Sequence, residues 1–522
     1  MEDMDNVMSH IEACEPVKMD FYTDRGFGSG YLKVADSCIN GILVLWNDLY
    51  LNINDCEENI FCHQFEGSDL ISKKEYLFAM DYLSNVLTAY KNTGKKIYKS
   101  VFERIISQFH TYFKEYGPVY GELPVYAQTL LFIKAFDVLE TIPFQEDFLI
   151  LLRKYAIWLM KDEYYQKNDN HGMFQNIALL HLSVLFGNCS EAVIWQKHGV
   201  ERINQLFKDT YFSDFTNNEH SILYFEYNNF LYEEVIKFCT YYKISGIEGI
   251  IEKLKLSKDA FAVLAHRDGS FPLIGDGEII KISESNACSR LFPDIGIAVL
   301  KVGDVYLSLK SKTVYQCHAH IDMSSITARY KDIDFLIDTG QYNYDRYTPI
   351  NRYVRSSAGH SGIFPLFADG MFQEEFCDSL EHAAITAYEH NCEDNTGFVR
   401  GEYKLKDNHV CREVSVSSNE IIIKDSWNCE KPGVMRQRFV IPKVFIEKAH
   451  FSVSNRILES EIDNIKFRFE VIYDMPDTMT VVQFGVYSPS YYAYEETMLL
   501  DTFAQNTISG EIMAKITFKE EE

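Results

Sequence analysis

Two histidines spaced two residues apart lie in the segment CHAHIDMSSI, which runs from Cys317 to Ile326. His318 and His320, with Asp322 just beyond them, are residue types that bind metal ions or transfer protons. In a β-strand, residues i and i+2 face the same side, so both imidazoles can enter one site. The alternative is structural, with two partly exposed histidines on one face of a sheet.

A polar run downstream favours a functional role for the histidine pair. Asp338 ends a predicted strand, and His360 follows a loop with four tyrosines and three arginines. A histidine, an aspartate and a histidine from neighbouring strands would suit a three-ligand zinc site. The loop suits an anionic sugar, since tyrosine stacks on sugar rings and arginine pairs with carboxylates. The loop residues that we predict to bind substrate are Arg346, Tyr347, Arg352, Tyr353 and Arg355.

Two more polar clusters stand at predicted helix starts in the first half of the chain. Asn170 and His171 precede an apolar helical pattern, where asparagine is also a common N-terminal cap. Further on, Glu219, Ser221 and Tyr224 begin another helix. Glu219 and Ser221 could equally be caps, and Tyr224 could be a core residue.

The hydrophobic pattern divides the chain into two parts that would position these residues. From about residue 69 to 265, apolar residues recur every three or four positions, which predicts successive amphipathic helices. Their packing would be a bundle, a solenoid or a closed ring of helical hairpins. From about residue 268 the period is two, with hairpin signals at Gly303-Asp304 and Lys331-Asp332. This pattern predicts an antiparallel β-sandwich, in which His318 and His320 fall at the start of a strand.

We therefore expect a multidomain α+β chain with three segments. Residues 1–68 form an N-terminal segment of mixed or irregular structure, residues 69–267 a helical domain, and residues 268–522 the β-sandwich. The segment AHRDGSFPLIGDGE at the second boundary carries Gly, Pro and Asp, as linkers do.

Composition narrows the range of partners. The net charge of −26 argues against nucleic acid, because phosphate binding needs a basic surface. A local cluster of arginines can still attract an acidic sugar within a Debye length of about 8–10 Å. The chain shows no leader, no membrane-length apolar run and no C-x-x-C pair among its twelve cysteines. We expect a cytoplasmic protein without membrane contact. A homo-oligomer is compatible with the composition.

The ordered set of motifs resembles the heparinase II/III-like polysaccharide lyases. The motifs are NHG, then E-x-S-x-x-Y, then H-x-H-x-D, and then a D-x-G strand end followed by S-x-A-x-H. The resemblance covers roughly residues 75–400. It implies an N-terminal (α/α) toroid of helical hairpins, a C-terminal antiparallel β-sandwich, and β-elimination of a uronic-acid-containing glycan.

The resemblance also implies a role for each matching residue. Asn170 and His171 match the pair that neutralises the uronate carboxylate, Tyr224 matches the catalytic tyrosine, and His318 matches the histidine that assists it. His320, Asp338 and His360 match the ligands of one structural Zn²⁺. Glu219 joins the loop residues as a predicted substrate contact, and Asp322 becomes a structural partner.

Two other functions compete with the lyase interpretation. A metal-dependent hydrolase could use His318, His320 and Asp338 to activate water. Hydrolases of that kind carry H-x-H early in a barrel, whereas helices precede the strands in this chain. A glycan-binding protein without activity is the third interpretation. The joint presence of Asn170, His171, Tyr224 and His318 argues against it.

Overall fold

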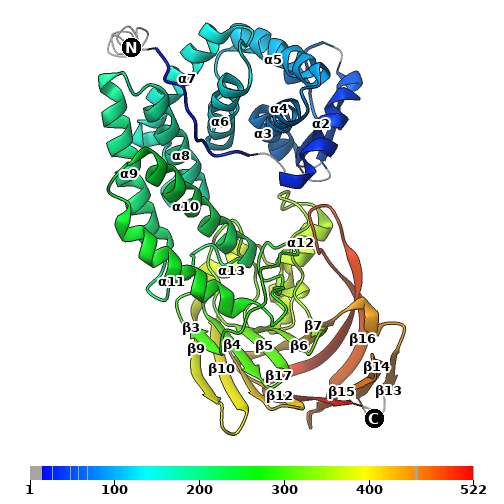
Figure 1. The fold of residues 1–522 in the computed structure, drawn as a ribbon. Helices are drawn as coiled ribbons and strands as arrows, with labels where there is room; N and C mark the ends of the chain where they lie inside the picture. Colours follow the sequence, from blue (N-terminus) through cyan, green and yellow to red (C-terminus); the bar gives the residue numbers. More distant parts are fainter. Residues whose placement is uncertain are drawn as a thin grey trace. The chain divides into compact units, whose positions relative to one another are not determined.

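The computed structural model describes residues 15–25, 28–46, 49–56, 58–67, 69–452 and 456–520. The first fourteen residues of the predicted N-terminal segment lie outside this part. Within it, ten helices precede the large sheets (Figure 1). They are α2 (Tyr31–Ile39), α3 (Leu70–Ala79), α4 (Asp81–Thr93), α5 (Lys96–Tyr116), α6 (Glu122–Val138), α7 (Gln145–Leu159), α8 (Asn170–Leu185), α9 (Ser190–Thr210), α10 (Ile222–Tyr242) and α11 (Glu248–Leu264).

The helices differ in how much of their circumference is buried. Helices α5 and α9 bury one face each and leave charged residues on the other. Helices α6 and α8 are buried on nearly all sides. A helix that is apolar all round must be enclosed by neighbours, whereas an amphipathic helix faces solvent. This alternation of enclosed and amphipathic helices is what a toroid of helical hairpins requires, and the helical part is the expected (α/α) toroid.

The segment before the toroid contains regular structure. After α2 the chain forms an antiparallel hairpin of β1 (Ile42–Trp46) and β2 (Leu49–Asn52). No helix in the described ranges has both the length and the apolar composition that a membrane span requires.

Two antiparallel sheets follow. The five-stranded sheet has the order β3–β4–β5–β6–β7, with β3 (Arg290–Phe292), β4 (Ile297–Val302), β5 (Val305–Lys310), β6 (Ser325–Tyr330) and β7 (Ile333–Leu336). The ten-stranded sheet has the order β13–β14–β15–β17–β12–β11–β10–β9, with β16 on β17 and β8 on β12. Its strands are β8 (Ile363–Pro365), β9 (Leu380–Asn391), β10 (Thr396–Leu405), β11 (Asn408–Val416), β12 (Glu420–Ile441), β13 (Ala449–Ser452), β14 (Ile457–Ile462), β15 (Ile465–Ile472), β16 (Thr478–Tyr487) and β17 (Glu495–Glu520).

One hydrophobic core joins the two sheets. Leu300 and Leu307 of the smaller sheet belong to the same buried cluster as Val399, Val414 and other residues of the larger sheet. The predicted antiparallel sandwich is confirmed. Both predicted hairpins are also present, since β4 pairs with β5 across residues 303–304 and β6 pairs with β7 across residues 331–332. Gly303 has φ +58°, the left-handed conformation that such two-residue turns need.

Among the described residues, two short α-helices interrupt the strands of this region: α12 (Pro349–Arg355) and α13 (Gln373–Ser379). The chain divides into two compact units, the first comprising Met1–Thr210 and Phe230–Lys253 and the second Tyr211–Asn229 and Leu254–Glu522. Helix α10 therefore begins in the second unit and ends in the first. A domain boundary at residue 267 stays a prediction.

Candidate active site

Asp276 is the centre of a buried polar cluster in the second unit. Its Oδ2 lies 3.0 Å from Nδ1 of His318, and its Oδ1 lies 2.9 Å from Nε2 of His320. Arg355 donates to the same Oδ1 through Nη1. Burial alone would raise the pKa of the Asp276 carboxyl, but Arg355 and the two histidines offset burial and hold that pKa far below its usual range. Asp276 is therefore a buried carboxylate with three donors.

Gly275 allows the backbone to approach this cluster. It has φ +70°, and a Cβ there would meet the carbonyl oxygens of His220 at 2.5 Å and His318 at 2.9 Å. Only glycine tolerates both the conformation and the close approach. The next residue, Asp276, donates its N–H to the His318 carbonyl at 2.9 Å. This bond fixes the aspartate against the histidine loop.

His318 lies between Asp276 and two residues at the start of α10. A carboxylate can only accept, so Nδ1 of His318 carries the hydrogen of this bond. Its other nitrogen, Nε2, lies 3.6 Å from Oε2 of Glu219. The imidazole stacks on the Tyr224 ring, with centroids 3.3 Å apart and planes 11° apart. Nε2 is thus the nitrogen of this ring that does not face Asp276.

Tyr224 shares a hydrogen bond with a second tyrosine. Its Oη and the Oη of Tyr344 are in contact, and either can be the donor. Burial is the main cause that raises the pKa of Tyr344 well above its ordinary value. Tyr344 therefore stays a neutral hydroxyl at physiological pH and can donate a hydrogen bond to Tyr224 or accept one from it.

The start of α10 places Tyr224 and Glu219. Ser221 Oγ accepts the Tyr224 N–H at 3.2 Å and donates to the Asp276 carbonyl, so Ser221 caps the helix and ties it to Asp276. Glu219 is not a cap, because its Oε1 accepts from Nδ2 of Asn228 at 2.7 Å and its Oε2 faces His318.

The prediction that His318 and His320 start a strand is wrong. They lie in residues 311–324, the loop between β5 and β6, and neither Asp338 nor His360 lies within a strand. Side-chain hydrogen bonds, and not a strand ladder, fix this loop. Thr313 Oγ1 donates to the His320 carbonyl at 2.6 Å, and Arg355 donates to the Ala319 carbonyl at 3.1 Å. Both imidazoles face one site because both donate to Asp276.

His320, Asp338 and His360 meet in one fully buried place. His360 Nδ1 lies 2.6 Å from Asp338 Oδ1, and the two histidine ring centroids are 5.4 Å apart. The remaining nitrogens, Nδ1 of His320 and Nε2 of His360, are buried without a hydrogen-bond partner. Burial lowers the pKa of His320 to about 4, so its ring is neutral. Among the described residues, no group of three or more His, Cys, Asp or Glu side chains is arranged to hold a metal ion.

Asp322 has a separate partner. Its Oδ2 lies 2.7 Å from Nζ of Lys310, and both side chains are buried. The aspartate that first suggested a metal ligand is therefore half of a buried ion pair on the same loop.

Asn170 and His171 begin α8 in the first unit. The cap of this helix is Asp169, whose Oδ1 accepts the His171 N–H at 3.0 Å, so the alternative that Asn170 is only a cap is wrong. Asn170 is buried, and its Oδ1 has no hydrogen-bond partner. The His171 ring is 40% exposed and lies 4.0 Å from Glu122. The His171 ring is thus accessible, whereas Asn170 is a buried amide whose oxygen has no protein partner among the described residues.

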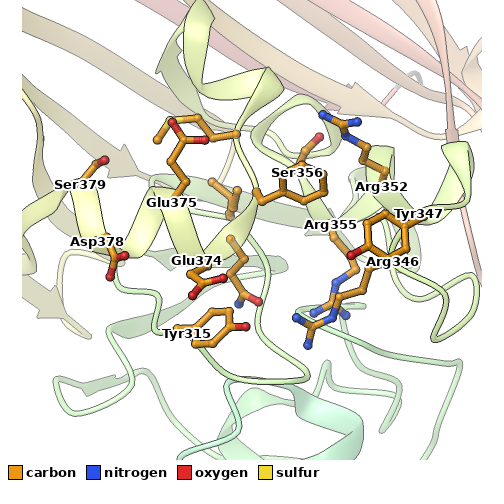
Figure 2. Close-up of a pocket in the computed structure, with 14 residues that line it drawn as sticks. Tyr315, Arg346, Tyr347, Arg352, Arg355, Ser356, Glu374, Glu375, Asp378 and Ser379 are labelled. Atoms are coloured by element: carbon orange, nitrogen blue, oxygen red, sulfur yellow. The ribbon is translucent and has the colours of Figure 1, made fainter.

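Four of the predicted substrate contacts line one cavity of about 620 Å³ in the second unit (Figure 2). These are Arg346, Tyr347, Arg352 and Arg355. Tyr353 does not line it; the hydroxyl of Tyr353 is buried, and its surroundings raise its pKa, mainly through burial. Glu219 belongs to the His318 cluster and not to the cavity lining.

Sequence reasoning missed Asp276 and Tyr344. Asp276 stands in a segment rich in Gly and Pro, which we interpreted as a linker. The GDG triplet, with a carboxylate between two glycines, is the signal that could have identified it. Tyr344 was one of four tyrosines in a loop, and nothing in the sequence distinguished it from Tyr347.

The chain thus has the class of fold in which an (α/α) toroid is followed by an antiparallel sandwich, and it carries a buried Tyr–His–Asp cluster in its second unit. The chain belongs to the heparinase II/III-like family. Residues 126–281 match the heparinase II/III N-terminus, and residues 284–484 match the heparinase II/III-like C-terminal region.

Solved structures share this fold at low sequence identity. A heparinase III structure is 12% identical with a TM-score of 0.82, over 99% of this chain and 89% of that chain. The heparan sulfate lyase HepC from Pedobacter heparinus is 13% identical with a TM-score of 0.66, over 98% and 87% of the two chains. The chondroitin AC lyase of Streptomyces coelicolor A3, in complex with chondroitin sulphate, is 7% identical with a TM-score of 0.59, over 100% and 83%. No curated protein matches the chain in sequence.

Proposed function

We propose that this protein is a polysaccharide lyase that cleaves a uronic-acid-containing glycan by β-elimination. The observation that carries the proposal is the stacking of Tyr224 on His318, with the Tyr344 hydroxyl bonded to Tyr224 and Asp276 fixing the histidine. Membership of the heparinase II/III-like family and the fold shared with glycosaminoglycan lyases support it.

The reaction needs a base at C5 of the uronic acid and an acid at the C4 glycosidic oxygen. The base takes the C5 proton, the electron pair of that C–H bond forms the C4=C5 double bond, and the C4–O bond breaks. The departing oxygen receives a proton. The products are a 4,5-unsaturated uronate and a new free hydroxyl, with no co-reactant required.

Tyr224 is the proposed proton-transfer group. A tyrosine has an unperturbed pKa near ~10 and serves as a base only when neighbours stabilise its phenolate. The Tyr344 hydroxyl can donate to that phenolate, and His318, which stacks on the Tyr224 ring, can take up a proton at Nε2. Positioned proton transfer of this kind contributes about 10²–10⁴ in rate.

Asn170 and His171 are proposed to neutralise the uronate carboxylate. The C5 proton lies next to that carboxylate, so negative charge develops on it as the proton leaves. Hydrogen-bond donors that already face the carboxylate are each worth about 10²–10³ in rate. The buried Asn170 amide, which does not serve as a cap, and the exposed His171 ring support this assignment.

A structural zinc at His320, Asp338 and His360 is part of the proposal. Asp276 and Asp338 each accept a hydrogen bond from one N–H of a neighbouring histidine, which leaves the lone pair of the other nitrogen for a metal. Those other nitrogens have no hydrogen-bond partner, and a nitrogen–nitrogen–oxygen donor set suits Zn²⁺. The metal would fasten the loop that carries His318 and would take no part in proton transfer.

A substrate screen tests the function. The protein is incubated with a panel of uronides: unsulfated and sulfated glycosaminoglycan oligosaccharides, and alginate-type oligosaccharides. Products are followed by the ultraviolet absorbance of the unsaturated uronate and, in parallel, by new reducing ends. Absorbance that rises in step with reducing ends is expected for at least one uronide. New reducing ends without absorbance would instead establish hydrolysis. If no uronide of the panel gives either signal, the lyase proposal fails and glycan binding without activity becomes the favoured function.

A further inference from the structure

The cavity of Figure 2 carries positive groups on one side that lack a protein counter-charge. Arg346 and Arg352 form no ion pair with a carboxylate in the part of the chain that the structure describes, whereas Arg355 is bound to Asp276. Arg352 lies 4.5 Å above the Phe372 ring and donates to the Gly370 carbonyl at 3.2 Å. Its guanidinium is thus held in place without being neutralised.

Exposed aromatic rings lie at the same cavity. Tyr315, Tyr347 and Phe372 line it and are 54%, 82% and 45% exposed. Exposed apolar side chains that gather beside polar groups mark ligand-binding surfaces, and flat rings stack on the apolar faces of sugars. Guanidinium groups that have no carboxylate partner among the described residues, beside exposed rings, fit an acidic saccharide.

The opposite side of the cavity is acidic. Figure 2 shows Glu374, Glu375 and Asp378 of α13 across from the arginines. Glu374 and Asp378 form no ion pair among the described residues, and Glu375 has only Lys406 at 3.9 Å, with both side chains about half exposed. The two charged sides therefore do not neutralise one another, and an anionic group bound near α13 would meet like charge.

The acidic side is fixed in position relative to the active site. Gln373, the first residue of α13, donates from Nε2 to the carbonyls of Val314 at 3.0 Å and Ala319 at 2.7 Å. Both carbonyls belong to the loop that carries His318. Arg355 lines the cavity and also bonds Asp276, so the cavity adjoins the Tyr224–His318 cluster.

We infer that this cavity is a subsite for a uronate–amino sugar pair whose amino group is unsubstituted and therefore cationic. The carboxylate pairs with Arg346 and Arg352, a sugar face covers Tyr347 or Phe372, and the ammonium group pairs with Glu374 and Asp378. An N-sulfated sugar would place an anion against these carboxylates, and an N-acetylated sugar would lose the ion pair. This inference rests on the proposed function, because it takes the ligand to be a uronide.

Binding measurements test the subsite independently of turnover. The Tyr224→Phe variant is titrated calorimetrically, in low salt at pH 6.5, with uronate–glucosamine oligosaccharides of equal length. The three ligands carry an unsubstituted, an acetylated or a sulfated nitrogen. We expect the unsubstituted ligand to bind about tenfold more tightly than the sulfated one. Glu374→Gln and Asp378→Asn should each reduce that ratio, while Glu381→Gln, which removes an exposed carboxylate of β9 outside the cavity, should not.

Equal affinities, a preference for the sulfated ligand, or a ratio unchanged by Glu374→Gln and Asp378→Asn would each overturn the subsite. The proposed function fails separately. If the wild-type protein releases no unsaturated uronate but the amino-group preference persists, the lyase proposal falls and the subsite stands. If unsaturated product forms but no preference is measured, the subsite falls and the lyase proposal stands.

Discussion

Asp276 organises the candidate site through three bonds from one carboxylate. One carboxylate oxygen accepts from His318 and the other from His320. The oxygen that faces His320 also accepts from Arg355, which in turn donates to the Ala319 carbonyl. Each bond also sets a proton position, since the histidine nitrogen that faces the carboxylate must carry the hydrogen. Asp276 does not touch the reacting atoms in this scheme and acts as a positioning residue.

Replacing this carboxylate should disturb both stability and catalysis. Asp276→Asn removes the charge that offsets Arg355 and turns an NH₂ group towards one of its present donors. Breaking a buried ion pair costs about 3–5 kcal/mol, so we expect a fall of that order in the free energy of unfolding, measured by urea denaturation. On a uronide substrate we expect kcat to fall about 10²-fold or more while KM changes little.

The control for this variant is Asp332→Asn. The Asp332 side chain is 91% exposed at a hairpin turn, and its loss should change the unfolding free energy by less than about 0.5 kcal/mol. If Asp276→Asn unfolds like the control and keeps the wild-type kcat, the positioning role is wrong.

At the scale of elements, the loop between β5 and β6 shows what the sequence could and could not predict. The period-two pattern correctly predicted the hairpins at residues 303–304 and 331–332, because strand ladders there follow the side-chain alternation. The same alternation around His318 and His320 predicted a strand that does not form. That loop is held by side chains distant in sequence, above all Asp276 and Arg355, and no local pattern encodes such contacts.

The loop between β5 and β6 is also where the proposed zinc should act. We expect about one zinc per chain in purified protein, measured by elemental analysis. His320→Ala and His360→Ala should each lose most of it, because each removes a nitrogen that has no other partner. His409→Ala, which removes an exposed histidine of β11, should keep the metal. Equal zinc content in all four proteins would contradict the assignment, and the metal-depleted variants should also lose activity as the His318 loop shifts.

At the scale of the whole molecule, the order of helices before strands could be read from the change of period, and the two-sheet core followed from it. The assignment of residues to compact units could not be read from the sequence. Residues 211–229 belong to the second unit although helices of the first unit flank them in sequence. Tyr224 and Glu219 lie in this short segment. The family resemblance had already paired Tyr224 with His318, but the contacts of this pair with Asp276 and Tyr344 could be found only from the three-dimensional structure.

Buried neutral histidines should make the folded state sensitive to acid. Thr23 donates its N–H to Nε2 of His181, so that ring is neutral with its proton on Nδ1, and burial lowers its pKa to about 4. Burial, followed by the nearby Arg329, lowers the pKa of His266 to about 3. Histidines in the unfolded chain take up protons below pH ~6.5, before these two do. Stability should therefore fall as the pH drops from about 6.5 to about 4.

Urea midpoints measured across this pH range check the expectation. His181→Gln removes one titrating group, whose share is about 3 kcal/mol at 1.36 kcal/mol per pH unit. The variant should lose less stability than the wild-type protein between pH 6.5 and 4. Parallel curves for the two proteins would show that His181 is not neutral in the folded state.

The central claim is that Tyr224 transfers the protons of a β-elimination. The most direct measurement is the rate at which unsaturated-uronate absorbance appears with the best uronide, compared between wild-type protein, Tyr224→Phe and Tyr241→Phe. Tyr241 is an exposed tyrosine on the same helix, so its variant controls for changes in α10. We predict that Tyr224→Phe lowers the rate by about 10²-fold or more while Tyr241→Phe keeps it. A Tyr224→Phe protein that forms the unsaturated product at the wild-type rate would contradict it.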